Sequence, residues 1–577
     1  MRIRGLSLLV CLGAFACSAW SQQYTISTIA GNGSAGFGGD SGPAAASQLN
    51  APSGLAFDSK GNLYIADSSN HRVRMISGGN ISTIAGTGTA SFSGDKAAAT
   101  SATLNTPSGV AFDSAGNLYI ADSLNNVIRK VSGGNITTIA GDYGQGAGYG
   151  GDTGQANVAI MNNPTAVVFD SAGNYYIADN GNSLIRKVDT NSVITSYLGA
   201  GATQGRINHP NALIYGPGNA LFISDSNNNR IAKYVAPTLS NFAGNLSAGF
   251  AGDGNTATLS QLNKPVGIAF DSAGNLYIAD SNNGRIRKVA TDGTISTIAG
   301  RGGASYTGDG GPATAATLNF PRGIAVASNG TIYIADTGNH VIRALTPVTP
   351  AISDGGVVNA ANFTARISPG ALATVFGSGF GASTIQPDLP LPTIAGGVSV
   401  TVNGKAAPIL FLSPGQINFQ VPWSTPTTGS VPVVVNVGTL PSNSVSVPAA
   451  TAAPGLFTLS TGAAIVQNFP DFSLNDPTNP IKAGGTIIAY LTGSGPVSPT
   501  VSDGAITPSD KLVSSTAAAT AKIGDATAVV TFTGLTPGFV GLAQMNITVP
   551  ASLTPGVYPL AITIDGQAAN TGTIAVK

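Results

Sequence analysis

Histidine, cysteine and carboxylate side chains are the groups in this chain that could perform nucleophilic, acid–base or metal chemistry. The three histidines are His71, His209 and His340. His209 stands in a different local context from the other two, so the sequence does not bring three together as a zinc site requires. Both cysteines, Cys11 and Cys17, lie in an apolar N-terminal segment, and the acidic residues are all aspartates with no asymmetric pair typical of a glycosidase. We therefore predict no catalytic residue and no metal site.

A Gly-Asp pair recurs in five similar segments and places one carboxylate in each. The aspartates are Asp40, Asp95, Asp152, Asp253 and Asp309. Calcium prefers oxygen ligands, but it takes about six to eight of them, and none of these segments has the dense alternation of aspartates found in calcium loops. We predict that each aspartate caps a short helical turn, and we keep calcium binding at these five residues as the alternative.

These segments alternate with a repeated apolar phrase, NLYIADS and its variants. The aspartates that close the six copies are Asp67, Asp122, Asp179, Asp225, Asp280 and Asp336, which lie 55, 57, 46, 55 and 56 residues apart. That period suits a four-stranded propeller blade with one loop. The nearly continuous apolar runs indicate strands buried on both faces. We therefore expect an all-β chain.

The segment TISTIAG, Thr25–Gly31, has the sequence that ends a repeat, yet it precedes the first repeat. The corresponding final strand is missing after Arg343 in the sixth copy. We predict a six-bladed β-propeller over residues 22–346, closed by Ile26–Ala30 as the outer strand of the last blade and paired with the strand around Val341–Ala344. Closure removes the two raw edges that an open array would expose.

Three residues after each repeated aspartate the chain carries an asparagine, followed by histidine in two copies. The triplets are Asn70-His71-Arg72, Asn125-Asn126-Val127, Asn182-Ser183-Leu184, Asn228-Asn229-Arg230, Asn283-Gly284-Arg285 and Asn339-His340-Val341. In these triplets the chain resembles the NHL-repeat family over about residues 24–345, which implies a propeller but no particular activity. Peptide-amidating lyases share this repeat and place metal-binding histidines just after the first proline of a blade. This chain has other residues there, which argues against that activity.

The position after that proline is the one that varies among the copies. It holds Ser53, Ser108, Thr165, Asn211, Val266 and Arg322. Because it starts the innermost strand, we expect it near the mouth of the central channel, where the single charge, Arg322, could orient an anionic group. We predict Ser53, Ser108, Thr165, Asn211 and Arg322 as ligand-binding residues. The linkers between repeats should share this face, either as a rim notched at the short linker Gly199–Ile207 or as ordered covers.

The N-terminus predicts export. Residues 1–21 combine Arg2 and Arg4, an apolar run and small residues near Ser21, which is typical of a signal peptide. The protein is then expected to be secreted, periplasmic or at the cell surface. No later apolar run is long enough for a transmembrane segment. Basic and acidic residues are balanced at 26 each, which argues against a nucleic-acid partner.

After a predicted linker at residues 347–355, a second duplication begins. GQINFQVP at Gly415 matches AQMNITVP at Ala543, and SPGALATVFGSGF at Ser368 matches KAGGTIIAYLTGSGP at Lys482. Strands rich in Val, Thr and Ile predict two Ig-like β-sandwiches, at 356–458 and 459–577. This pair resembles the Solibacter-type C-terminal region of exported acidobacterial proteins, which implies a bacterial, exported protein but no activity. We expect Trp423 to pack inside this region.

Together these features favour an exported, non-catalytic binding or scaffold protein. The propeller would present its loop face to a protein, peptide or glycan, and the sandwiches would act as a spacer or surface attachment. Two alternatives stay open: a propeller lyase or lactonase acting at the channel mouth, and an oligomeric structural component of the cell surface. The first hypothesis requires no cofactor.

Overall fold

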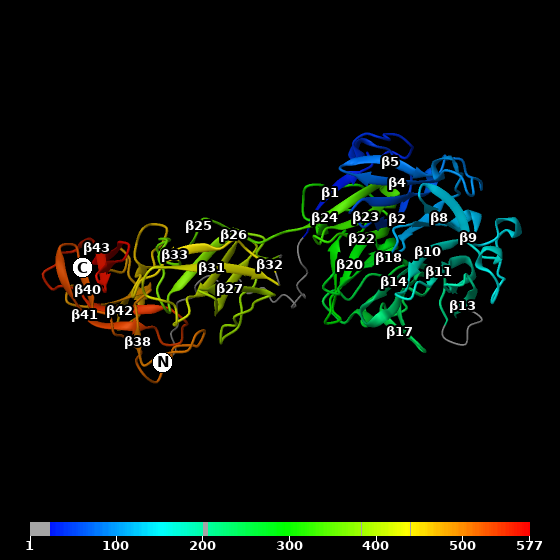
Figure 1. Ribbon diagram of the computed structural model, residues 1–577. Coiled ribbons are helices and arrows are strands. Elements are labelled where there is room, and N and C mark those ends of the chain that lie inside the picture. Colours follow the sequence, from blue (N-terminus) through cyan, green and yellow to red (C-terminus); the bar gives the residue numbers. More distant parts are fainter. Residues whose placement is uncertain (1–23, 200–205, 382–383, 439) are drawn as a thin grey trace. The chain divides into compact units, whose positions relative to one another are not determined.

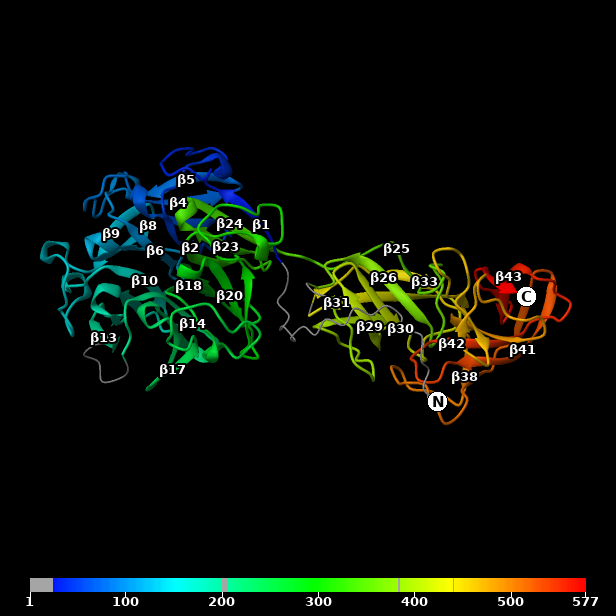
Figure 2. The same ribbon diagram turned by 180° about the vertical axis from the view of Figure 1, so that it is seen from behind.

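The computed structural model describes residues 24–577 apart from 200–205, 382–383 and 439 (Figures 1 and 2). The predicted signal peptide lies outside the described residues. In the part that is described, all regular structure is β-strand or short 3-10 turn. The chain divides into two compact units, one that ends at Val348 and one that spans Thr349–Lys577.

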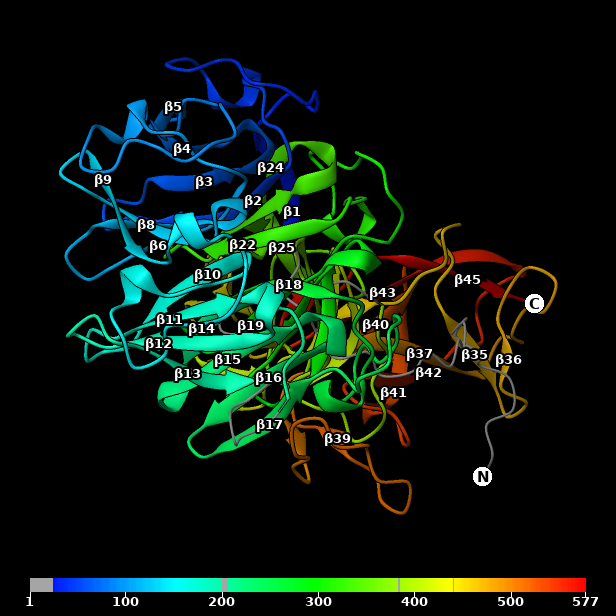
Figure 3. The same ribbon diagram turned by 90° about the vertical axis from the view of Figure 1, so that its right-hand side faces the viewer.

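The first unit contains six four-stranded antiparallel sheets, which we number in chain order (Figure 3). Sheets one to three are β2 (Pro52–Phe57), β3 (Leu63–Asp67), β4 (Arg72–Ser77) and β5 (Asn80–Ala85); β6 (Pro107–Phe112), β7 (Leu118–Asp122), β8 (Val127–Ser132) and β9 (Asn135–Ala140); and β10 (Pro164–Phe169), β11 (Tyr175–Asp179), β12 (Leu184–Val188) and β13 (Ile194–Gly199). Sheets four to six are β14 (Pro210–Gly216), β15 (Ala220–Asp225), β16 (Arg230–Val235) and β17 (Thr238–Ala243); β18 (Pro265–Phe270), β19 (Leu276–Asp280), β20 (Arg285–Val289) and β21 (Ile295–Ala299); and β22 (Pro321–Val326), β23 (Ile332–Asp336), β24 (Val341–Pro347) and β1 (Tyr24–Ala30).

The first strands of the six sheets contact one another in a closed cycle, β2–β6–β10–β14–β18–β22 and back to β2. We call this arrangement the ring and these strands the inner strands. Glycine allows four of them to approach closely: a Cβ at Gly323 would lie 2.0 Å from the carbonyl oxygen of Ser53, and one at Gly267 would lie 2.0 Å from that of Arg322. The inner strands therefore pack backbone to backbone at these points.

The predicted pairing of the N-terminal segment is confirmed. β1 pairs antiparallel with β24, with Ile26 opposite Leu345 and Ser27 opposite Ala344. Figure 1 shows the blue β1 beside the green β24, so the two ends of the first unit share sheet six.

Two kinds of 3-10 turn connect the strands of the first unit. One follows the second strand of each sheet: η2 (Ser68–Asn70), η4 (Ser123–Asn125), η7 (Asn180–Asn182), η9 (Ser226–Asn228), η11 (Ser281–Asn283) and η13 (Thr337–Asn339). The other lies in the long linkers: η1 (Ala44–Ala46), η3 (Ala99–Ser101), η6 (Ala156–Val158), η10 (Ala257–Leu259) and η12 (Ala313–Ala315). Two further turns are η5 (Tyr143–Gln145) and η8 (Pro217–Asn219). The η2-type turns lie beside the linkers, because Asn70 donates a hydrogen bond to the linker carbonyl of Gly36.

The long linkers cover the outer edges of the sheets. In sheet one, Ile81 of β5 exchanges backbone hydrogen bonds with Ser41 and Gly42 of the linker. In sheet six, Ile26 of β1 does so with Gly310 and Gly311. Ile136, Ile194 and Ile295 make the same exchanges in sheets two, three and five. These linkers are therefore ordered covers that pair with the free backbone groups of the edge strands. This is the second of the two roles that the sequence analysis gave for them.

The unit Thr349–Lys577 is also built from strands. Its first half holds β25 (Ala351–Asn359), β26 (Leu372–Ser378), β27 (Val398–Val402), β28 (Lys405–Ala407), β29 (Ile409–Ser413), β30 (Gln416–Gln420), β31 (Ser430–Val437), β32 (Leu440–Pro441) and β33 (Val445–Pro448). Its second half holds β34 (Gly455–Leu456), β35 (Val466–Phe469), β36 (Ser473–Leu474), β37 (Thr486–Thr492), β38 (Val497–Ser498), β39 (Ser514–Ser515), β40 (Ala519–Ile523), β41 (Ala526–Leu535), β42 (Ala543–Thr548), β43 (Gly556–Ile564), β44 (Gln567–Ala568) and β45 (Gly572–Val576).

The duplicated motifs occupy equivalent places in these two halves. In the first half, SPGALATVFGSGF forms β26 and GQINFQVP forms β30, and these strands are hydrogen-bonded neighbours. In the second half, KAGGTIIAYLTGSGP forms β37 and AQMNITVP forms β42, which are neighbours too. In the second half β41 pairs with both β42 and β40, so the strands form one continuous path. Trp423 packs against Val497, Val513 and Leu535, so it belongs to the contact between the halves. No helix in the described part of the chain is long and apolar enough to cross a membrane.

Candidate functional site: a hollow over the inner strands

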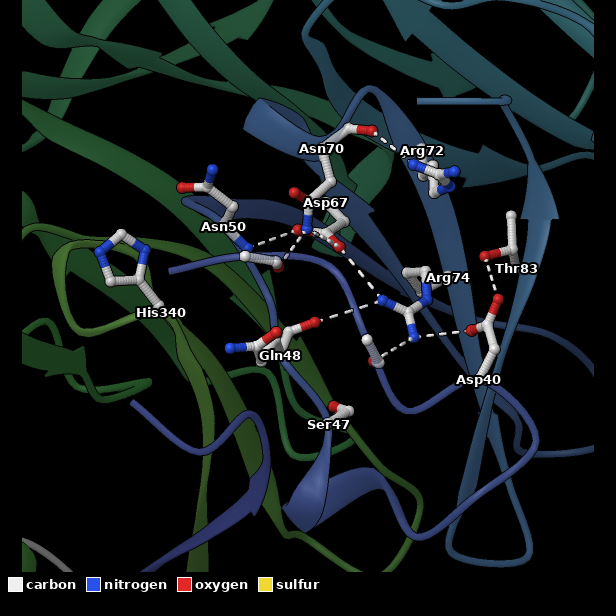
Figure 4. Close-up of polar contacts among 12 residues, drawn as sticks. Asp40, Ser47, Gln48, Asn50, Asp67, Asn70, Arg72, Arg74, Thr83 and His340 are labelled. Atoms are coloured by element: carbon white, nitrogen blue, oxygen red, sulfur yellow. Dashed lines mark hydrogen bonds and ion pairs between the residues drawn. The ribbon is translucent and has the colours of Figure 1, made fainter. Parts of the chain in front are cut away.

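In five of the six sheets, the carboxylate at the end of the second strand meets a buried arginine from the third strand. In sheet one, Arg74 Nη1 lies 3.4 Å from Asp67 Oδ2, and Arg74 Nη2 lies 2.6 Å from Asp40 Oδ1 in the linker (Figure 4). The Arg74 side chain is fully buried. One guanidinium thus ties the linker to the sheet through two carboxylates.

The same cluster recurs in four other sheets. The linker aspartate, arginine and strand aspartate are Asp95, Arg129 and Asp122; Asp152, Arg186 and Asp179; Asp253, Arg287 and Asp280; and Asp309, Arg343 and Asp336. An aromatic linker residue covers each arginine, with Phe37 above Arg74 and Phe250 above Arg287, both at 4.9 Å from the ring centre. Sheet four has the short linker, carries Ala232 in place of the arginine, and pairs Asp225 with Arg230 instead.

The five linker aspartates therefore make ion pairs with arginine, which favours a structural role over a calcium site. The expected capping role is not what they perform: the turns η1, η3, η6, η10 and η12 receive no side-chain cap bond. Among the described residues there is no group of three or more histidine, cysteine and acidic side chains that could hold a metal ion.

Burial raises the pKa of Asp67 to about 6, against the hydrogen bonds from Asn50 and Asn70 and the charge of Arg74, which lower it. Burial likewise raises the pKa of Asp122, Asp179 and Asp336 to about 6. These carboxylates are thus mostly ionised at neutral pH, but they take up a proton at a higher pH than an exposed aspartate does.

Three of the predicted ligand-binding residues are engaged within the ring. Ser53 Oγ lies 2.6 Å from Ser68 Oγ and donates to the carbonyl of Ser108. Ser108 Oγ bonds Ser123 Oγ and donates to the carbonyl of Thr165 at 3.3 Å, and Thr165 Oγ1 donates to the carbonyl of Pro210 at 3.1 Å. These hydroxyls tie neighbouring inner strands together.

The structure brings Asn211, Val266 and Arg322 together on the other side of the ring. They line a hollow of about 330 Å³, with the remaining wall formed by Asn180, His209, Ser226, Asn227, Lys264, Ser281, Asn282 and Phe320. These residues come from the starts of inner strands and from the η2-type turns, so the hollow opens on the face where the sequence places the channel mouth. Its volume is at the lower end of the range for small-molecule sites.

The position before the inner-strand proline supplies side chains that sequence reasoning missed. Its residue has a left-handed backbone in all six sheets: Ala51, Thr106, Asn163, His209, Lys264 and Phe320, with φ between 48° and 52°. Left-handed φ costs a non-glycine residue about 1–2 kcal/mol. In the first three sheets the residue is small or an amide, whereas in the last three it is large, and those three line the hollow. Comparing this position across the repeats could have found it.

In five of the six NHL-type triplets, the side chain of the second residue accepts a hydrogen bond from the backbone amide at this strained position in the following sheet. His71 Nδ1 accepts a hydrogen bond from the amide of Thr106 at 3.1 Å, and His340 Nδ1 accepts one from the amide of Ala51 at 3.1 Å. Asn229 Oδ1 does the same for Lys264. The two triplet histidines therefore have a structural role in these contacts.

The hollow has an excess of positive charge. Lys264 and Arg322 are both exposed, and within the described residues neither side chain makes an ion pair or hydrogen bond. No aspartate lines the wall. The carboxylates that end the second strands of sheets four to six, Asp225, Asp280 and Asp336, are already paired with Arg230, Arg287 and Arg343. The walls of the hollow partly enclose the Arg322 guanidinium and so lower its pKa, although a guanidinium stays charged. Together these features make the hollow suited to an anionic group.

Three family models match parts of the chain. The NHL repeat model matches residues 49–74 and 318–345, the teneurin NHL domain model matches 245–307, and the IPT/TIG domain model matches 358–450. The chain thus contains NHL repeats and an Ig-like domain of the IPT/TIG type. The Solibacter-type attribution of the C-terminal region stays a prediction.

Among curated proteins, human teneurin-1 is 27% identical over 404 residues, which cover 59% of this chain and 14% of teneurin-1. The Arabidopsis thaliana protein SUPPRESSOR OF QUENCHING 1, chloroplastic, is 29% identical over 325 residues, covering 52% of this chain and 30% of that protein. The chain therefore spans less than a third of the length of these relatives. Among solved structures, an auxiliary nutrient binding protein from Bacteroides thetaiotaomicron is 16% identical with a TM-score of 0.42, covering 56% of this chain and 77% of that one.

Proposed function

We propose that this protein is an exported, non-catalytic binding protein whose ring is a six-bladed NHL-type propeller with its ligand site in the hollow. The observation that carries the proposal is the asymmetry of an otherwise repetitive face. Ser53, Ser108 and Thr165 are engaged within the ring, whereas Lys264 and Arg322 stand unpaired among the described residues in a concave site. Polar groups that converge in a concavity without satisfying one another are typical of a binding site.

Several structural roles are already accounted for elsewhere in the ring. The buried arginine clusters hold linkers in five sheets and the triplet histidines hold turns in two, so they belong to the scaffold rather than to the site. The unit Thr349–Lys577, which we interpret as two Ig-like sandwiches, would act as a spacer or surface attachment, with the whole protein secreted, periplasmic or at the cell surface.

The test is a glycan and peptide array probed with the mature chain and with Val266→Trp, which would fill the hollow. Ser59→Trp, in an exposed turn outside the hollow, is the matched control. We expect hits that Val266→Trp abolishes and Ser59→Trp retains, with equal melting temperatures. Hits that survive Val266→Trp, or no hits at all, would remove the hollow as the site.

The same experiment separates the alternatives. Mass spectrometry of a bound ligand after incubation shows whether it is cleaved or opened, as a lyase or lactonase would do. Light scattering of the full chain shows whether it assembles, as an oligomeric surface component would do.

A further inference from the structure

We propose that the hollow recognises an acidic sugar, with Arg322 and Lys264 holding its carboxylate and Phe320 packing against its ring. This inference rests on the proposed function, since it names the ligand class of the same site. It begins from the two cations, which come from adjacent sheets and which no described carboxylate neutralises. A guanidinium presents a planar fork of donors that matches a carboxylate.

The rest of the wall is suited to hydroxyl groups. Asn211, Asn227 and Asn282 contribute amides and Ser281 contributes a hydroxyl, whereas Asn180 Nδ2 and Ser226 Oγ already donate to the carbonyls of Pro210 and Pro265. An amide carries both donors and an acceptor, and a sugar hydroxyl is also both. The Asn211 amide nitrogen donates to Ser226 Oγ at 2.8 Å, so its orientation is fixed before a ligand arrives, while the Asn282 side chain makes no hydrogen bond among the described residues.

Phe320 supplies the apolar element. Its side chain is 52% exposed although its backbone is held at φ 48°. The backbone strain at this position is therefore not offset by burial of the phenyl group. An exposed aromatic side chain beside amides and a cation gives an apolar platform with a polar surround, which fits the flat C–H face of a pyranose.

The experiment is calorimetry of the full mature chain with uronic-acid oligosaccharides, namely galacturonate, glucuronate and mannuronate dimers and trimers. Each is compared with its carboxyl-reduced, neutral counterpart. We expect at least one uronate to bind, and reduction of its carboxylate to weaken binding at least tenfold. Arg322→Gln should weaken it by a similar factor, because the carboxylate then loses its main partner.

Three further variants test for effects of net charge and of folding. Arg301→Gln takes away an exposed arginine outside the hollow and should leave the Kd unchanged, so it controls for net charge. Lys264→Gly removes the second cation and also relieves left-handed strain, so lost binding cannot be attributed to unfolding. Ala51→Gly relieves strain at the equivalent position in sheet one and should bind normally.

The outcomes are distinguishable from those of the proposed function. A neutral glycan that binds in the hollow, with no uronate binding, would overturn the acidic-sugar inference and leave the binding function intact. Preferential binding of an acidic peptide or of inorganic phosphate would overturn it as well. If Arg322→Gln and Arg301→Gln weaken uronate binding equally, the effect comes from the net charge of the protein and the acidic-sugar site is overturned.

Discussion

The buried arginines are the residues on which each linker depends. Arg186 is fully buried, lies 2.6 Å from Asp152 and 3.4 Å from Asp179, and has Tyr149 stacked above it. Two carboxylates of different origin share one guanidinium, so the arginine neutralises charge that the fold would otherwise leave without compensation. Sheet four shows the dependence within a single chain, since the arginine and the linker aspartate are absent together there.

Arg186→Met should therefore destabilise the ring by about 3–5 kcal/mol, because it leaves Asp179 buried without its ion-pair partner. Chemical denaturation followed by tyrosine fluorescence measures the loss. The control is Lys187→Met on the next residue of β12, whose side chain is only half-buried and forms no ion pair within the described residues. A cost below about 1 kcal/mol for Arg186→Met, or similar costs for both variants, would contradict the proposed role.

At the scale of the element, each sheet and its linker form one unit with its own titration behaviour. In sheet two, burial raises the pKa of Asp122 to about 6, above the ordinary aspartate value of 3.8. The turn carboxylate Asp113 behaves in the opposite way: hydrogen bonds from Asn117 outweigh its burial and lower its pKa. The two kinds of aspartate therefore act on stability in different pH ranges.

A group whose pKa is raised by folding binds its proton more tightly in the native state, so it favours folding as the pH falls. We expect the free energy of unfolding to rise as the pH is lowered from 6 towards 4, and to fall below pH 4 as carboxylates of the Asp113 type are protonated. Denaturation at a series of pH values measures this curve. Asp122→Asn should flatten the rise between pH 6 and 4; a curve that declines steadily from pH 7 would contradict the assignment.

The repeat pattern predicts the elements well because a period of about 55 residues fixes both the sheets and their order. The pairing of Ile26–Ala30 with β24 follows from a sequence copy found out of order. The arginine clusters were not predicted, since Arg74 and its equivalents lie on apolar strands where the pattern gives no sign of a distant linker aspartate. Their partners are brought near only by the linker's path along the outer strand.

The candidate site was half predictable for a related reason. Repeat register selects positions that vary, and two of the positions that it selected, Asn211 and Arg322, line one concavity. It could not separate them from Ser53, Ser108 and Thr165, because a hydroxyl that bonds a neighbouring carbonyl has the same sequence signature as one that awaits a ligand. Lys264 and Phe320 were not predicted as site residues. Their left-handed backbone is imposed by the turn, and neither lysine nor phenylalanine is a residue type that signals such a backbone in a sequence.

At the scale of the whole molecule, the ring depends on a contact between residues more than 300 positions apart in sequence. Ile26 of β1 is fully buried in a cluster with Leu345, Ala313 and Ile298. Its backbone bonds β24 on one side and the linker residues Gly310 and Gly311 on the other. The N-terminal strand is thus packed like any internal strand, and it also covers the edge of β24 that would otherwise be exposed.

The chain provides its own control for this closure, because ISTIAG occurs at Ile26 and again at Ile295, where β21 is continuous with its sheet. Both isoleucines are fully buried, so Ile26→Ala and Ile295→Ala should each cost about 2–5 kcal/mol. Deleting residues 22–31 should cost more than either and cause concentration-dependent association, because β24 then presents an open edge. If Ile26→Ala proves nearly neutral while Ile295→Ala does not, the N-terminal strand does not close the ring, and the hollow would have to be reconsidered with it.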